Sequence, residues 1–194
     1  MNKKNILNTL KTIEKNTKAL QSEKFLNLIV KASEIIIKSL KNKNKILFCG
    51  NGGSAADSQH LSTELLGKYL KIRKALASVD LTSNTSLITS IGNDISFKEI
   101  FARQISAIGL KNDVLFAITT SGKSENIIQA LKVCKKRKIK SICLTKKNYP
   151  KKLNYICDVI LPVPAHRVDR IQEMHIFIGH TICEILEKKL SWNK

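Results

Sequence analysis

A histidine and a glutamate four residues apart, His60 and Glu64, are the first side chains in this chain that suggest chemistry. In a helix this spacing places both side chains on one face, one turn apart. An imidazole and a carboxylate placed in this way can bind a metal ion or share a proton. Solvated surface pairs have the same spacing, so the interpretation depends on the surrounding sequence.

A glycine-rich turn lies just before this pair. The apolar run Ile46–Cys49 predicts a strand buried in a parallel sheet. The turn after it consists of small and polar residues: Gly50, Asn51, Gly52, Gly53 and Ser54. Free amides at the start of the next helix would bind an anion, and Ser54 would cap that helix with Asp57 at its third position. The alternative is a turn and a cap without a ligand, since the pattern is neither a dinucleotide fingerprint nor a P-loop.

A second polar segment follows another apolar run, at 114–118. Four of its first six residues carry a hydroxyl: Thr119, Thr120, Ser121 and Ser124. The other two are Gly122 and Lys123. A helix expected around Ile127 would add its free backbone amides. A helix cap alone uses fewer hydroxyls than this, so the segment predicts a phosphate site.

Two further groups of residues leave alternatives open. Asn93 and Asp94 follow a glycine, where such residues either form a turn or bind the hydroxyls of a sugar. The last helix, expected to begin near Asp169, carries Gln172 and His180. Gln172 fits a capping box with Asp169, and a histidine on a core helix is usually a packing residue with a hydrogen bond.

The elements that must position these residues alternate between strand and helix. Apolar runs predict strands at 46–49, 75–79, 114–118, 139–144 and 156–163, and helical periodicity occurs at 3–20, 23–40 and 96–108. Repeated strand–helix units imply an α/β fold, in which helices cover both faces of a parallel sheet. Ligands of such sheets bind at the carboxyl ends of the strands, where both polar loops lie.

The length of 194 residues suits a single domain, 1–194, in which residues 1–41 form N-terminal helices that pack on the core or on a neighbouring subunit. No apolar stretch is long enough for a signal peptide or a membrane span, so we expect a cytoplasmic protein without a membrane partner. Five cysteines without a CxxC pair lie mostly in apolar runs, which predicts reduced thiols and no disulfide.

The formal net charge of +19 raises the question of nucleic-acid binding. Lysines spread along the chain supply most of the excess, arginine is scarce, and aromatic residues at 5% give no platform for stacked bases. We therefore expect no nucleic-acid partner, and a general attraction for phosphorylated small molecules.

Four motifs occur in order along the chain: CGNGGSAADSQH with Glu64, then GND, then TTSGKS, then DRIQEMH with His180. Together they closely resemble the sugar isomerase (SIS) family, specifically the bacterial phosphoheptose isomerases, over nearly the whole chain. The resemblance implies a flavodoxin-like three-layer sandwich with a five-stranded parallel sheet, and a homotetramer with active sites between subunits. The implied reaction converts sedoheptulose 7-phosphate into D-glycero-D-manno-heptose 7-phosphate through an enediol. This is the first step towards nucleotide-activated heptose for lipopolysaccharide or capsule.

The resemblance also implies roles for individual residues. Glu64 and His180 become the catalytic acid and base. One zinc ion per subunit is implied, with the ligands His60, Glu64, Gln172 and His180. Contacts to the sugar and its phosphate are implied for Asn51, Gly52, Gly53, Ser54, Glu64, Asn93, Asp94, Thr119, Thr120, Ser121, Ser124 and Gln172.

The spacing of these ligands predicts a further property. Gln172 and His180 lie about 12 Å apart along a helix, whereas zinc ligands approach the metal to about 2 Å. Unless the helix is distorted or the side chains lean together, we expect one ligand to come from a neighbouring subunit. Zinc also weakens a bound carboxylate as a base, so the two roles of Glu64 compete. Lys68 stands where these enzymes commonly carry arginine, which keeps the charge but loses bidentate binding.

Two other functions are compatible with the sequence. One is a non-catalytic regulator of the same fold that binds the bacterial replication initiator, a protein whose ending also resembles HRVDRIQEMH. Such a regulator has no need of a buried acid/base pair, so the presence of both Glu64 and His180 favours the enzyme. The other is an isomerase of another phosphosugar, because a phosphate site does not measure the length of the sugar.

Overall fold

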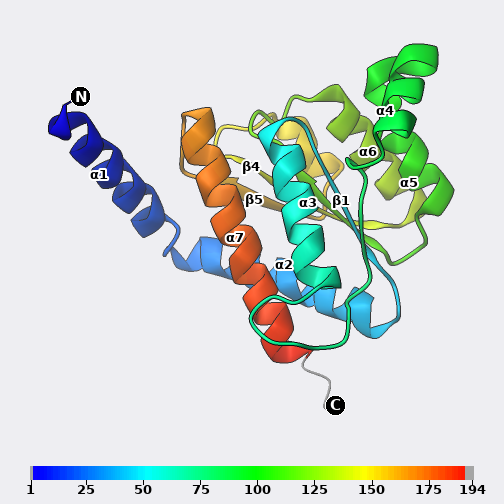
Figure 1. The fold of residues 1–194 in the computed structure, drawn as a ribbon, viewed down its shortest axis with the longest axis horizontal. Coiled ribbons are helices and arrows are strands. Elements are labelled where there is room, and N and C mark those ends of the chain that lie inside the picture. The colour runs from blue at the N-terminus through cyan, green and yellow to red at the C-terminus, as the bar shows by residue number, and fades with distance from the viewer. Residues whose placement is uncertain (1, 191–194) are drawn as a thin grey trace.

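Five parallel strands form the centre of the computed structural model, which describes residues 2–190 (Figure 1). In chain order the strands are β1 (Ile46–Gly50), β2 (Ser78–Asp80), β3 (Val114–Ile118), β4 (Lys140–Lys146) and β5 (Val159–Val163). Their order across the sheet is β2-β1-β3-β4-β5, which is the flavodoxin-like order. The direction of winding changes between β1 and β3, so a ligand crevice is expected at their carboxyl ends. The predicted α/β fold is confirmed.

Helices cover both faces of the sheet (Figure 1). They are α1 (Lys3–Ala19), α2 (Glu23–Lys41), α3 (Gly53–Leu66), α4 (Thr85–Ile91), α5 (Ala102–Ile108), α6 (Glu125–Arg137) and α7 (Val168–Lys189). Alternate residues of β1 enter two separate cores: Phe48 packs with α2, α3 and α7, and Leu47 packs with α4, α5 and α6. Because both faces of β1 are buried, its sequence is apolar without alternation.

The two N-terminal helices relate differently to this body. α2 packs against it through a buried stripe that includes Phe25, Ile29 and Ile36. α1 projects away from it, at the left of Figure 1. Leu7 and Leu10 of α1 remain 50% and 57% exposed, so much of its apolar surface is uncovered in the single chain.

The segment 96–108 is not the single helix that its periodicity predicted. α4 continues into a π-helical turn (Gly92–Ser96), which is followed by a 3-10 turn (Phe97–Glu99) and only then by α5. Ser96 has an extended backbone, with φ −176° and ψ 144°, and its hydroxyl accepts from the amide of Lys98. A serine that bonds the nearby backbone in this way competes with the helix and interrupts it. The second strand also begins later than predicted, at Ser78.

The cysteines and the helices agree with the compositional expectations. All five cysteines have free thiols, and burial is the main cause that raises the pKa of Cys134 to about 12 and that of Cys157 to about 11. Such thiols are unreactive near neutral pH. None of the helices within residues 2–190 combines the length and the hydropathy needed to cross a bilayer.

Candidate active site

His60, Glu64 and His180 come together on the outer side of α3 and α7. His60 Nε2 lies 3.1 Å from Glu64 Oε1 and 3.0 Å from His180 Nε2. One ligand atom from each residue lies within 4.8 Å of the other two. The side chains of His60 and Glu64 are 49% and 20% exposed, so the cluster faces solvent in the single chain. The expected acid/base pair of Glu64 and His180 is partly buried rather than fully buried in the single chain.

α3 and α7 approach each other closely because glycine lies at the contact. A Cβ on Gly179 would lie 2.6 Å from the side chain of Leu61, closer than a real Cβ contact. A Cβ on Gly53 would collide with the amide of Gln172. The two histidines of the cluster are the chain neighbours of Leu61 and Gly179, so this close approach brings their ring centroids to 4.9 Å.

Gln172 lies at the other end of the same helix contact. Its carboxamide lies against Gly53 in the first turn of α3, about 10 Å along the helix before His60. α7 is one continuous helix of 22 residues, so Gln172 and His180 keep the separation that the sequence predicted. The helix has no side-chain cap, so the expected capping box of Asp169 and Gln172 is wrong. The ligand role of Gln172 stays a prediction.

The surroundings of the cluster change two pKa values. Burial, and then the nearby His60, lower the pKa of His180, while Glu64 opposes the shift. A neutral imidazole can both accept and donate a proton. Asp57 lies one turn before His60, and burial raises its pKa to about 6 against an opposing contribution from His60. Its Oδ2 is buried and has no hydrogen-bond partner.

The donor set of the cluster fits zinc. Two imidazole nitrogens and a carboxylate oxygen are ligands that zinc takes at catalytic sites. Tetrahedral ligands at 2.0–2.1 Å from the metal lie about 3.3 Å from one another. The observed separations of 3.0 Å between the histidine nitrogens and 3.1 Å from His60 to Glu64 require only small displacements.

The hydroxyl-rich segment 119–124 forms a compact turn between β3 and α6. Gly122 has φ +67°, and its amide donates to Thr119 Oγ1. Thr119 Oγ1 and Ser124 Oγ are 3.3 Å apart, and the amide of Lys123 donates to Ser121 Oγ. Ser124 is the N-cap residue of α6, so these hydroxyls lie at a positive helix end. The structure thus brings together the residues that the sequence predicted for phosphate.

A pair of asparagines joins this turn to the glycine-rich turn after β1. Asn51 and Asn126 exchange two side-chain hydrogen bonds, of 2.9 and 2.8 Å. Asn126 is buried and also accepts from the amide of Ile127. The two turns therefore lie side by side at the carboxyl ends of β1 and β3, where a crevice was expected. Asn126 was not predicted, because nothing in its local sequence signals the contact with Asn51.

Ser54 does not have the capping role that the sequence suggested. α3 begins at Gly53 with Gly52 as the N-cap residue, at φ +56°. Ser54 therefore lies inside the first turn, where it is buried and its carbonyl accepts from the hydroxyl of Ser58. The start of α3 thus has no side-chain cap of its own. The amides of Ser54 and Ala55 in this turn donate to the carbonyls of Asn51 and Gly52, so what the start of α3 offers an anion is chiefly its positive helix end.

Asn93 and Asp94 lie on a different element from the cluster, in the π-helical turn after α4. The side-chain amide of Asn93 donates to one carboxylate oxygen of Asp94, and the hydroxyl of Ser90 donates to the other. Asp94 also lines a hollow of about 420 Å³ with Arg103 and Gln104. Their contacts with substrate stay a prediction.

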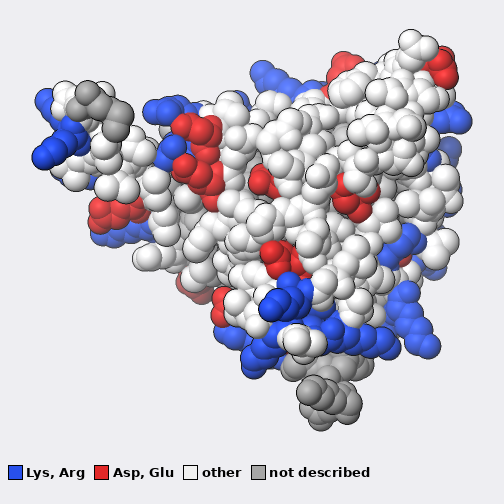
Figure 2. Space-filling model, viewed as in Figure 1, with Lys and Arg blue, Asp and Glu red and all other residues white. Residues whose placement is uncertain are grey.

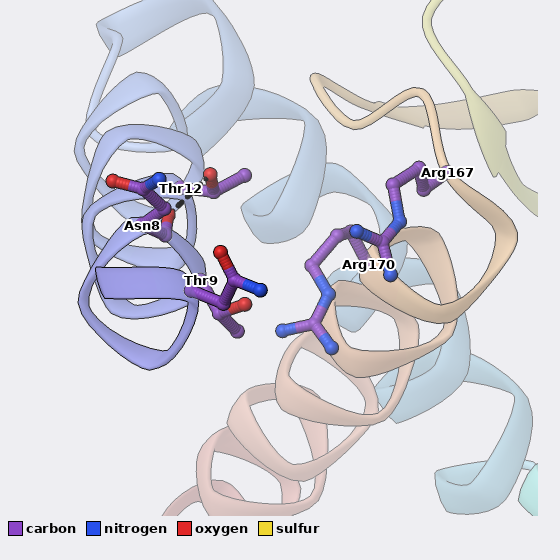
Figure 3. Close-up of a pocket in the computed structure, with 6 residues that line it drawn as sticks. Asn8, Thr9, Thr12, Arg167 and Arg170 are labelled. Carbon is purple, nitrogen blue, oxygen red and sulfur yellow. Dashed lines mark hydrogen bonds between the residues drawn. The ribbon is translucent and has the colours of Figure 1, made fainter. Parts of the chain in front are cut away.

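A separate hollow of about 360 Å³ lies between α1 and the start of α7 (Figure 3). Asn8, Thr9 and Thr12 of α1 lie across it from Arg167 and Arg170. None of the residues predicted for the reaction lines this hollow. It follows from the way α1 stands away from the body.

Lysine and arginine side chains gather along the lower edge of the face shown in Figure 2. The end of α7 lies at this edge, together with part of α2 and the connection after α3, as a comparison with Figure 1 shows. Acidic side chains are scattered above it. The positive charge that the composition indicates is therefore uneven on this face.

Two residues of the connection after α3 were also missed by the sequence analysis. The ring centroid of Tyr69 lies 5.8 Å from that of His180. Arg73 donates hydrogen bonds to the carbonyls of Glu64 and Leu65. The basic and apolar composition of this segment gave no sign of either contact.

Known proteins share both this fold and this sequence pattern. Residues 8–146 match the family described as SIS domain. A phosphoheptose isomerase of Aliarcobacter butzleri is 50% identical over 161 residues, which cover 83% of this chain and 85% of that protein. A phosphoheptose isomerase of Clostridium acetobutylicum is 47% identical over 183 residues, which cover 94% of this chain and 93% of that protein.

Two solved structures agree in fold over nearly their whole length. The phosphoheptose isomerase of Neisseria gonorrhoeae has a TM-score of 0.89 at 37% identity, covering 96% of this chain and 98% of that one. A phosphoheptose isomerase of Francisella tularensis has a TM-score of 0.90 at 32% identity, covering 97% of this chain and 100% of that one. The family match over 8–146 and these identities show that this chain belongs to the SIS-domain family and, within it, to the phosphoheptose isomerases.

Proposed function

We propose that this chain is an aldose–ketose isomerase that converts sedoheptulose 7-phosphate into D-glycero-D-manno-heptose 7-phosphate. The observation that carries the proposal is the meeting of Glu64 and His180, beside His60, in a chain 50% identical to a phosphoheptose isomerase. We further propose that the reaction takes place in the cytoplasm, as the first step towards nucleotide-activated heptose for lipopolysaccharide or capsule.

The residue types of the cluster suit this reaction. Moving a carbonyl between C1 and C2 transfers one proton between the two carbons and one between the two oxygens. Glu64 takes the proton from the carbon beside the carbonyl and returns it to the neighbouring carbon. His180, whose lowered pKa favours its neutral form, passes a proton between the oxygens. Groups of this kind each contribute about 10²- to 10⁴-fold to the rate.

The two loops at the carboxyl ends of β1 and β3 hold the phosphate and the nearby sugar hydroxyls. The hydroxyls of segment 119–124 and the positive helix ends at the starts of α3 and α6 are suited to an anion. His60 lies about 10 Å along α3 from Gly53, which leaves room for an extended sugar between its phosphate end and its carbonyl end. Asn93, Asp94 and Gln172 complete the proposed contacts.

His60, Glu64 and His180 would hold one zinc ion per subunit, and a zinc ion there would polarise the substrate carbonyl. The amide of Gln172, which lies against Gly53, would reach such a site from a neighbouring subunit or after a change of its side-chain conformation. Glu64 acts as a base only through a carboxylate oxygen that is free of the cation, because cation binding lowers the basicity of a carboxylate.

We propose a homotetramer with active sites between subunits. The half-exposed side chains of Leu7 and Leu10 on α1 support this arrangement, because a second copy would cover them. The exposure of His60 supports it as well, since a second copy would enclose the cluster and exclude water from the reaction.

Turnover of sedoheptulose 7-phosphate by the purified full-length protein tests the proposal. We expect conversion by the wild type, loss of conversion after treatment with a chelator, and recovery on addition of zinc. Six-carbon and five-carbon ketose phosphates, assayed in parallel, should be converted at least tenfold more slowly. Asp113→Asn removes a buried carboxylate whose partners, Lys45 and the amide of Leu110, are not residues of the cluster, so it serves as a variant with normal turnover per folded protein.

Faster conversion of a shorter phosphosugar would make that sugar the proposed substrate in place of the heptose phosphate, with the same proposed mechanism. If no sugar phosphate is converted with any metal, the proposal that this chain is an isomerase would be wrong. The next measurement would then be binding to the bacterial replication initiator.

A further inference from the structure

We propose that Arg73 and Glu187 are positioning residues for the reacting cluster. They form a buried ion pair that holds the end of α3, which carries Glu64, against the end of α7, which carries His180. The side chains of Arg73 and Glu187 are only 6% and 7% exposed. This inference deepens the proposed isomerase and rests on it.

Arg73 binds the last turn of α3 from outside the helix. One of its terminal nitrogens donates to the carbonyl of Leu65 at 2.9 Å and to that of Lys74 at 3.0 Å, and the other donates to the carbonyl of Glu64 at 2.6 Å. The last four carbonyls of a helix have no partner within it, and a cation is favourable there. The last turn of α3 has no basic residue of its own, so Arg73 supplies this contact.

Glu187 holds the other side of the connection. Its two carboxylate oxygens accept from the backbone amides of Leu70 and Lys71, at 3.2 and 3.3 Å. The carboxylate is also 3.6 Å from Arg73 Nε, an ion pair rather than a hydrogen bond. A carboxylate in the last turns of a helix is unfavourable by itself, so its burial there needs these partners.

Apolar packing holds this connection only near its two ends, where Tyr69 packs against the core and Leu76 is buried in it. Leu70 and Ile72 are 66% and 86% exposed, although they lie between residues that are held inward. Arg73 and Glu187 therefore hold the exposed middle of the connection, residues 70–73, over the ends of the two helices. The same path places the ring of Tyr69 at 5.8 Å from that of His180, between centroids.

The geometry of the cluster depends on this arrangement. Glu187 follows His180 by two helical turns on the same face of α7, and Arg73 binds the carbonyl of Glu64 itself. A shift of either helix end would change the distances that bring His60, Glu64 and His180 together. Residues that orient metal ligands from behind typically change metal affinity or activity by about 10- to 100-fold when mutated.

The test uses Glu187→Gln and Arg73→Lys in the full-length protein. Glu187→Gln keeps one oxygen that can accept from a backbone amide, so it is the milder change. We expect kcat to fall about 10- to 100-fold and the zinc affinity to fall by a similar factor. The KM for sedoheptulose 7-phosphate should stay within about twofold, because segment 119–124 is not touched.

Asp113→Asn is a matched control. Asp113 is also a buried carboxylate, paired with Lys45 at 2.7 Å and accepting from the backbone amides of Lys45 and Leu110. It precedes β3, so it lies at the opposite edge of the sheet from the two turns. We expect this variant to lower the melting temperature while leaving kcat and zinc affinity within about twofold.

The double variant Arg73→Lys/Glu187→Gln separates positioning from general damage. Because both residues hold the same connection and pair with each other, its loss of kcat should be smaller than the product of the two single losses. Losses that multiply, an equal loss in Asp113→Asn, or single variants within twofold of wild type would each overturn the inference. If the wild type shows no turnover, the isomerase fails instead, and zinc affinity across the same variants still decides the positioning role.

Discussion

The cluster of His60, Glu64 and His180 and the hydroxyl turn 119–124 are built in opposite ways. The turn gathers its side chains within six residues and holds them by bonds between near neighbours, such as Gly122 to Thr119. The cluster brings together residues 120 positions apart, on two long helices. An anion can be bound by any loop with free amides and hydroxyls, whereas proton transfer needs side chains held to a fraction of an ångström.

Different forces therefore maintain the two regions. The turn relies on the positive φ of Gly122 and on the start of α6. The cluster relies on the contact between α3 and α7, where glycine allows close approach, and on the Arg73–Glu187 pair. Changes in the cluster should affect the rate of the reaction, and changes in the turn should affect the binding of substrate.

The largest expected effect comes from Glu64→Gln. The amide keeps the size of the side chain but cannot take a proton, so kcat should fall by about 10²- to 10⁴-fold with little change in KM. Steady-state kinetics with sedoheptulose 7-phosphate measures both constants. A kcat within threefold of wild type would remove Glu64 from the role of base.

His175, on the inner side of α7, should affect the stability of the protein rather than the rate of the reaction. His175 is fully buried, and burial lowers its pKa to about 4 against a smaller opposing contribution from the Thr145 backbone. The unfolded chain binds a proton on this residue first, below about pH 6.5. The contribution of neutral His175 is thus fully present above pH 6.5 and is lost as the pH falls towards 4.

His175→Met should therefore gain stability relative to wild type on acidification. Between pH 7 and pH 4 the difference in free energy of unfolding should move by about 3 kcal/mol in favour of the variant. Urea unfolding at a series of pH values measures it. Parallel curves for the two proteins would show that His175 is protonated equally in the folded and unfolded states.

Gly179→Ala tests the close approach of the two helices. Its new methyl group would lie 2.6 Å from the side chain of Leu61, so α3 and α7 must move apart. We expect a loss of about 1–3 kcal/mol of stability, as for other overpacked cores, together with weaker zinc binding. Thermal unfolding and zinc titration measure the two effects. Weakened zinc binding without any loss of stability would contradict this account of the contact.

The smallest effect is expected from Ser121→Ala in the hydroxyl turn. Ser121 contributes one hydroxyl, and its loss should raise KM by about 3- to 10-fold with kcat nearly unchanged, as for one hydrogen bond of about 1 kcal/mol. Steady-state kinetics against substrate concentration gives the answer. A fall in kcat at constant KM would instead place this turn in the reacting machinery.

The fold was largely predictable because strand and helix are encoded locally. The buried run before Gly50 and the helical stripe of α2 have the periodicity of their structures, and the repeated units imply a parallel sheet. Segment 96–108 was mispredicted because its apolar spacing is helical while Ser96 bonds the backbone and breaks the helix. Ser54 was misplaced as a cap because Gly52 turns the chain two residues earlier than the capping pattern implies.

The sequence by itself determined the residue types, the helical spacing of His60 and Glu64, and the two polar turns at strand ends. The family resemblance placed His180 with that pair, and the structure brings them together, but only the tertiary structure decided that Gln172 lies against Gly53 and that His60 faces outward. It also decided that Arg73 binds the carbonyl of Glu64 and that Asn126 pairs with Asn51. The physical reason is that spacing along a helix fixes which face a side chain occupies, whereas the packing of helices fixes what that face meets.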